Sequence, residues 1–220
     1  MRNGWIVGVV GVLGVGLMSL SLAAFALETG LVTALSGNVQ LLEEKTAAVA
    51  LKPFVKVREG DRLALGENTR LQLVYFEGGR QETWQGSGTL LVGSQASKVV
   101  KGGLQAETKS LPSILLKQLS KTPSSDGNVR AGMVRLRSMP NLESLESVES
   151  QYAALRQEAA ANDRSPELYL LASYFELRAF DKVEALLRQM RDKTPKDSEI
   201  EALNALYVRA MAEANSAEQR

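Results

Sequence analysis

Short apolar runs with a period of two fill the first half of the chain. Leu63 and Leu65 alternate with a polar and a small neighbour, and the run 70–76 alternates in the same way. Such alternation places one set of side chains against a core and the other toward solvent, as in antiparallel sheets. The turn 77–80 (EGGR) supplies the backbone freedom of a tight hairpin. Strands are expected at 31–36, 38–42, 49–57, 62–65, 70–76, 80–85, 89–93 and 98–101, with Pro53 placing the third at a sheet edge or a bulge.

Helical periodicity replaces this pattern in the second half. Apolar residues recur every three or four positions over 141–161, which predicts an amphipathic helix. Ser165, Pro166 and Glu167 have the order of a cap, a first-position proline and an acid in the first turn. Asp181 is expected to cap the next helix, which Thr194 and Pro195 end, and a last helix starts near 198. A shorter amphipathic helix is predicted at 113–121, and the tail 214–220 is expected to fray.

The residues that the chain lacks limit its chemistry. With no cysteine and no histidine, the usual nucleophile–base pairs and transition-metal ligands are missing. The net charge of +1 gives no bulk attraction to nucleic acid. Glu43 and Glu44 are adjacent acids, and adjacent side chains diverge on a strand, so they form a poor catalytic pair. We therefore expect a protein that is not an enzyme and binds no cofactor, metal or nucleic acid.

The N-terminus has the pattern of an export signal. Arg2 is the only charged residue before Glu28, and the apolar stretch 5–22 is followed by small residues at Ala24 and Ala26. This order predicts a signal peptide over 1–26, cleaved after Ala26, and a periplasmic or secreted chain. An uncleaved inner-membrane anchor facing the periplasm is the alternative, in which only this segment would contact the membrane.

The β-rich half resembles the FecR domain family. The resemblance covers about 30–100 and rests on the segments SGNVQLL, VREGDRLALGENTRLQLVYFEGGR and TWQGSGTLLV. The residues that carry it are Ser36, Gly37, Asn38, Val39, Gly60, Asp61, Leu71, Leu73, Glu77 and Gly78. Glycine and aspartate at these positions are also what turn geometry alone requires.

The resemblance implies an extracytoplasmic β domain used in protein contact. Such domains are best known from regulators that pass a transport signal across the inner membrane, in which a cytoplasmic domain that holds a sigma factor precedes the membrane span. At most four residues precede the apolar stretch here, so direct sigma-factor control is not expected.

A basic connector is predicted over 102–140. Eight basic residues lie between 98 and 137, against only Glu107 and Asp126. Three interpretations remain open: a solvated linker, a segment docked on the more acidic helical half, or a contact with anionic lipid or surface polymer. Up to Pro140 the exported chain has 15 basic and 10 acidic residues, and the numbers are reversed after it, which favours docking over the lipid contact.

The helical half resembles one degenerate tetratricopeptide unit with a flanking helix on each side. The matching positions are Tyr174, Leu187 and Pro195, whereas Leu171 and Val183 stand where smaller residues are usual. A single unit cannot bury both of its faces, so the flanking helices would cover it. The apolar stripe is either this core or a groove for a peptide or helix of a partner.

Three aromatic residues are the candidate binding positions. Trp84 lies on a polar strand, where an exposed ring could stack on a sugar or a peptide, or where it could instead close the core. Tyr75 and Phe76 face opposite sides of their strand, so at most one belongs to a core whose other face is wet. Tyr174 is one of the positions that match the tetratricopeptide pattern.

The sequence thus predicts an α+β protein in which an all-β FecR-like sandwich or roll (27–101) precedes a tetratricopeptide-like helical domain (141–213). The expected function is a non-enzymatic extracytoplasmic adaptor that contacts an envelope protein partner, with a possible role in signalling. The alternatives are a glycan- or surface-polymer-binding protein and an inner-membrane-anchored sensor subunit.

Overall fold

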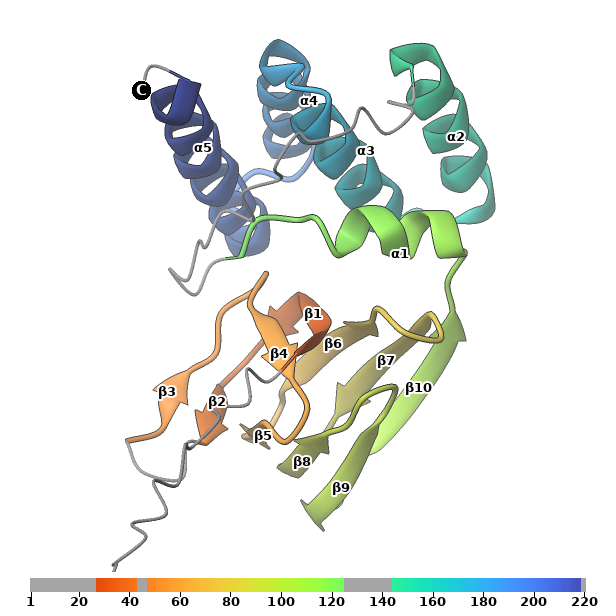
Figure 1. The fold of residues 1–220 in the computed structure, drawn as a ribbon. Coiled ribbons are helices and arrows are strands. Elements are labelled where there is room, and N and C mark those ends of the chain that lie inside the picture. Colours follow the sequence, from red (N-terminus) through yellow and green to blue (C-terminus); the bar gives the residue numbers. More distant parts are fainter. Residues whose placement is uncertain (1–26, 43–46, 125–143, 219–220) are drawn as a thin grey trace, which may run out of the picture.

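The computed structural model describes residues 27–42, 47–124 and 144–218 (Figure 1). The predicted signal segment, Glu43 and Glu44, and residues 125–140 of the predicted connector lie outside these residues. Within them, no helix is both long and apolar enough to cross a bilayer.

Ten strands form two antiparallel five-stranded sheets. Sheet A has the order β10-β7-β6-β1-β4, and sheet B the order β3-β2-β5-β8-β9. Both sheets lie below the helices in Figure 1. The strands are β1 (Glu28–Ser36), β2 (Val39–Leu42), β3 (Val49–Ala50), β4 (Lys56–Arg58), β5 (Arg62–Leu65), β6 (Arg70–Tyr75), β7 (Arg80–Gln85), β8 (Gly88–Val92), β9 (Ser97–Gly102) and β10 (Gln105–Ser110). The predicted α+β organisation, with strands first and helices after them, is confirmed.

The structure corrects the strand prediction in two places. The run 49–57 is divided by a turn at Pro53 into β3 and β4, which are edge strands of different sheets. Proline is tolerated at this point because it lies in the turn between β3 and β4 and not within a strand. The β region also continues past its predicted end at Lys101, since β10 pairs with β7 over six residues.

Sheets A and B share a core made by the alternation read from the sequence. Leu63 and Leu65 are buried, whereas Arg62, which precedes Leu63 on the same strand, is exposed. The side chains that pack together here are those of Val32, Val39, Leu51, Val57, Leu63, Leu65, Leu71, Leu73, Tyr75, Trp84, Leu90 and Val92. Tyr75 is the core member of the 75–76 pair, and Phe76 is half-buried on the other side.

Two glycines face each other where sheet B ends. Gly88 of β8 and Gly102 of β9 are register partners. A Cβ on Gly102 would lie 2.5 Å from the Cα of Gly88, and a Cβ on Gly88 would lie 2.2 Å from the carbonyl oxygen of Lys101. Since no side chain fits at either distance, the two backbones approach this closely only as a glycine pair.

A short helix separates the sheets from four longer helices. Figure 1 shows α1 (Ser113–Leu119) crossing between sheet A and the helical layer. Pro112 is the N-cap of α1 and has an extended backbone conformation. The layer contains α2 (Leu145–Glu158), α3 (Ser165–Glu176), α4 (Phe180–Lys193) and α5 (Ser198–Glu218).

The helix ends differ in detail from those predicted. The N-cap of α3 is Arg164 rather than Ser165, whose backbone N–H instead donates to Asp163 Oδ1 at 2.9 Å. Asp181 lies in the first turn of α4, after the N-cap Ala179. The last helix does not fray at 214 but continues to Glu218. Proline at the first turn and the end of α4 after Lys193 are as predicted.

One hydrophobic core joins the sheets to the helices. Phe54 and Val74 come from the β region, yet they pack with Leu115 and Leu119 of α1 and with buried residues of α2 to α5. Phe54 is 2% exposed and Val74 is fully buried. The face of sheet A on which Val74 lies is therefore covered at this point, and the strands and helices share one core.

Candidate functional site

Trp84 belongs to the core and not to a binding surface. Its side chain is 6% exposed, and its Nε1–H donates to Glu82 Oε2 at 2.9 Å. The ring is therefore closed off from a sugar or peptide that would stack on it. Trp84 therefore closes the sandwich core, which is the second of its two interpretations.

Glu82 is the centre of this buried polar cluster. Its carboxylate is fully buried and accepts from Arg80 Nε at 2.7 Å, from Trp84, and from the backbone N–H of Ser97 at 3.2 Å. A buried carboxylate is tolerated when its lone pairs are filled in this way. Glu82 thereby ties β7 to the start of β9. The buried position of Glu82 has no signal in the sequence, because an acid within a polar strand looks like a solvated side chain.

Tyr75 is also enclosed. Its ring is fully buried, and its hydroxyl and Ser97 Oγ lie 2.6 Å apart. Burial raises the pKa of Tyr75 to about 12, against the opposing effect of the Ser97 hydrogen bond. Tyr75, Ser97 and Glu82 thus form one continuous polar path through the sandwich core, which holds the sheets in register rather than presenting a ligand site.

Tyr174 joins three helices. The residue is 7% exposed, and its hydroxyl donates to Glu149 Oε1 of α2 at 2.8 Å. Lys182 of α4 donates to the same oxygen at 2.8 Å. The Lys182 hydrogen bond lowers the pKa of Glu149, and burial together with Glu149 raises the pKa of Tyr174. Tyr174 therefore serves to link helices, and its ring is not free for a partner.

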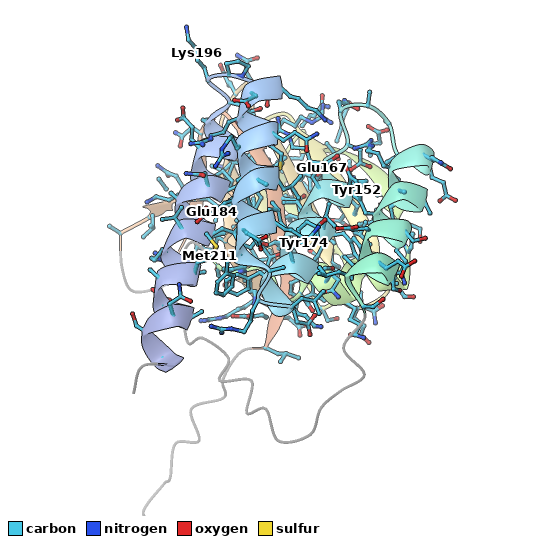
Figure 2. All side chains as sticks on the ribbon, turned by 90° about the horizontal axis from the view of Figure 1, so that it is seen from above. Tyr152, Glu167, Tyr174, Glu184, Lys196 and Met211 are labelled. Carbon is cyan, nitrogen blue, oxygen red and sulfur yellow. The ribbon has the colours of Figure 1, made fainter. Side chains whose placement is uncertain are left out.

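A second polar link attaches α2 to α3. Figure 2 shows Tyr152 and Glu167 close together between these helices. Tyr152 donates to Glu167 Oε1 at 3.2 Å, and Arg156 Nη1 lies 3.0 Å from Glu167 Oε2. Val148 is the one buried residue of α2, and these polar contacts add to the packing of Val148, Tyr152 and Leu155 against the core.

The open surface of the described residues is hollowed around the β6–β7 turn. One shallow hollow of about 450 Å³ lies between this turn and α1, and its walls include Phe76, Leu111 and Leu116. A second hollow of about 400 Å³ lies on the β10 side and is lined by Arg80 and Lys109. Gly78 borders both, so we name the pair the turn groove. Figure 1 shows the β6–β7 turn reaching toward α1 beside β10.

Gly79 lines the α1 side of the turn groove and packs closely against Leu111 and Leu116. Its φ is +68°, and a Cβ there would lie 2.9 Å from the carbonyl oxygen of Leu111 and 2.9 Å from Leu116 Cδ1. The carbonyl of Gly79 also accepts from the Leu111 backbone N–H at 2.8 Å. The turn therefore seats directly against the segment that leads into α1, which only glycine permits.

Two cations of the basic segment are docked on the helical layer. Lys109 of β10 lies 2.8 Å from Asp163 Oδ2, and Lys121 after α1 lies 2.5 Å from Glu176 Oε1. For these two lysines the docking interpretation is confirmed. Lys98 and Lys101 belong instead to β9, within sheet B.

Among the residues that the structure describes, no group of three acidic side chains is placed to hold a metal ion. The chain matches no protein-family profile, no curated protein and no solved structure. The turn groove is thus the feature on which a functional interpretation of the surface depends.

Proposed function

We propose that this chain is a non-enzymatic adaptor of the bacterial cell envelope, which holds two protein partners in a fixed relation. The observation that carries the proposal is the shared core. Phe54 and Val74 pack in the same cluster as α1 and the helical layer. An adaptor built in this way transmits the position of a partner on one half to a partner on the other.

Three carboxylates among the described residues take part in hydrogen bonds that hold the fold together. Glu82, Glu149 and Glu167 each accept hydrogen bonds from a cation and from an aromatic side chain. Carboxylates occupied in this way position helices and strands. They fit a protein that acts by shape and surface.

We propose that the β half is a FecR-like domain. Supporting this, the resembling residues Gly60 and Gly78 both adopt a positive φ in turns. Asp61 Oδ2 accepts from the Arg58 backbone N–H at 2.8 Å across the turn between β4 and β5. These positions therefore have the turn roles that the resemblance implies.

We propose that α3 and α4 form one tetratricopeptide-like unit, with α2 and α5 as its covers. Supporting this, α3 has 12 residues and α4 has 14, and Pro195 follows before α5. Leu171 and Val183, the two unusually large residues, are fully buried where α3 and α4 pack. Larger residues at these points set the helices further apart than the small residues of the family would.

Export is tested with a reporter fusion. Residues 1–30 fused to alkaline phosphatase should give activity in intact bacteria, because the reporter is active only outside the cytoplasm. Leu13→Arg should abolish that activity by interrupting the apolar stretch, whereas Asn3→Gln should leave it unchanged. Retention of the full chain in the cytosolic fraction would contradict the extracytoplasmic proposal. A membrane-bound, uncleaved product would select the anchored alternative.

The adaptor role is tested by photocrosslinking in living cells. A photoreactive residue is placed at Val49 of β3 or at Val208 of α5, both of which are 52% exposed. Each position should crosslink a different envelope protein, and a probe at Leu203, which is 1% exposed, should crosslink none. A single common partner, or none at either position, would contradict an adaptor that joins two proteins.

A further inference from the structure

We propose that the turn groove binds an extended acidic peptide carrying an apolar anchor residue, supplied by a partner protein. The inference rests on the proposed contact function and assigns the chemistry of one contact. Its first support is the shape of the surface, since two hollows of about 450 and 400 Å³ share Gly78 as a lining residue. Hollows of this size accommodate a few side chains.

The two hollows differ in chemistry. The α1 side has Phe76, Leu111 and Leu116 as apolar walls, with Lys117 at its edge. The β10 side has Arg80 and Lys109 together with polar groups such as Gln95 and Thr108. A ligand that fits both must therefore offer an apolar group to one side and an anionic group to the other.

The charged side chains that line the turn groove are all cationic. Lys117, Arg80 and Lys109 line it, and no aspartate or glutamate among the described residues does so. Glu77 is exposed at the turn but lines neither hollow. Arg80 and Lys109 share their charge with Glu82 and Asp163, yet their side chains remain 46% and 51% exposed.

Lys117 is the strongest recognition residue. It is exposed on α1, and in the described part of the chain it makes no ion pair. Lys117 is exposed because Leu115, Leu116 and Leu119 occupy the buried side of the same helix. An acidic ligand would supply the counter-charge that the fold itself does not.

An extended peptide suits this arrangement better than a polymer or a lipid. Successive side chains of an extended chain point in opposite directions, so a peptide with alternating acidic and apolar residues presents both groups at once. An anionic polysaccharide would leave the walls formed by Phe76, Leu111 and Leu116 unused. Among the described residues β10 is an edge strand of sheet A, and it lines the groove, so it offers the peptide backbone a strand to pair with.

The binding test uses the purified full chain and fluorescence anisotropy. The probe is a short fluorescein-labelled peptide in which aspartate and leucine alternate. It should bind with a Kd that rises steeply with salt. Versions with asparagine in place of aspartate, or serine in place of leucine, should each bind at least about tenfold more weakly, since each removes one of the two contacts.

A matched pair of charge reversals locates the site. Lys117→Glu should weaken the probe by about tenfold or more, whereas Lys98→Glu, on the exposed β9 strand outside the groove, should leave the Kd within about twofold. Circular dichroism and the Tm establish that both variants are folded. Equal loss in both variants, or no binding of the probe, would overturn the inference.

Competition decides between classes of ligand. Vesicles of anionic phospholipid or an anionic polysaccharide that displaced the probe with the same Lys117 dependence, and at lower concentration, would overturn the peptide assignment. Failure here is distinguishable from failure of the adaptor proposal. If two partners crosslink at Val49 and Val208 while the probe does not bind, the adaptor stands and the groove inference falls.

Discussion

The backbone N–H of Leu35 in β1 donates a hydrogen bond of 2.8 Å to Glu199 Oε1 in α5, across 164 positions of sequence. The other oxygen of this carboxylate lies 2.5 Å from Arg164 Nη1, just before α3. One side chain therefore connects the first strand, the entry to α3 and the first turn of α5. This polar contact joins the strands to the helices, as the apolar packing of Phe54 and Val74 also does.

Glu199→Ala should lower the free energy of unfolding by about 2 kcal/mol, because it removes a charge-assisted bond and leaves the Leu35 N–H without its acceptor. The matched control is Glu201→Ala, an exposed acid in the same first helical turn. Both variants lose the same interaction with the helix dipole, so their difference isolates the junction. Chemical denaturation measures it, and equal effects of the two substitutions would show that the Leu35 contact adds nothing.

Phe54→Ala should destabilise the whole chain by about 3 kcal/mol, since a large aromatic side chain that is 2% exposed leaves a cavity. Because the cavity lies in the shared core, fluorescence and circular dichroism should still report one transition. Val49→Ala, at a position 52% exposed, should change stability by less than about 0.5 kcal/mol. Two separate transitions in the unsubstituted chain would contradict a core common to strands and helices.

Glu82→Gln should lower the free energy of unfolding by about 2 kcal/mol. The amide keeps the volume of the side chain but loses the negative charge to which Arg80 and Trp84 donate hydrogen bonds. Glu107→Gln, on the exposed face of the neighbouring strand β10, is the control and should be neutral. The near-ultraviolet circular dichroism of Trp84 should change only in the first variant. An unchanged Trp84 signal in Glu82→Gln would mean that the indole does not depend on this carboxylate.

Acid should loosen the contact between β10 and the helical layer. Burial acts to raise the pKa of Asp163, but the hydrogen bonds from Lys109 and Ser165 outweigh it and hold that pKa below its ordinary value of 3.8. The folded state thus binds the proton less readily than the unfolded chain does. The stabilisation is fully present above pH 3.8 and is lost as the pH falls from 3.8 through the lowered value.

The Tm measured from about pH 6 to about pH 2 tests this dependence. In Asp163→Asn the decrease of the Tm below pH 3.8 should be smaller than in the unsubstituted chain. Asp192→Asn, at an exposed position of α4, should follow the unsubstituted chain. Identical pH profiles for all three proteins would show that Asp163 does not contribute.

The strands and helices that bury a regular stripe were predictable. Leu71 and Leu73 alternate into the sheet core, and Val183, Leu186, Leu187 and Met190 are buried along α4 as their spacing indicated. The polar strand β10 was not, because all six of its residues are exposed and only backbone pairing to β7 defines it. Periodicity reports burial, and this strand buries nothing.

The same limit of sequence periodicity applies to the candidate binding residues. Trp84, Tyr75 and Tyr174 are rings on polar or amphipathic segments of the sequence, and all three are buried with polar partners. Ser97 and Glu149 are distant from their tyrosines in sequence, and Glu82, although close to Trp84, looks like a solvated acid of a polar strand, so none of these partners gives a local signal. The turn groove combines residues from the β6–β7 turn, α1 and β10, so only the tertiary structure brings Arg80 and Lys117 to one surface.

The opposed glycines of β8 and β9 restrict how this chain can diverge. Because neither Gly88 nor Gly102 has space for a methyl group, mutation at one cannot be compensated by mutation at the other. Descendants of a common ancestor should therefore retain both glycines even after most other positions have changed. The pair offers a marker by which remote homologues of this chain could be recognised.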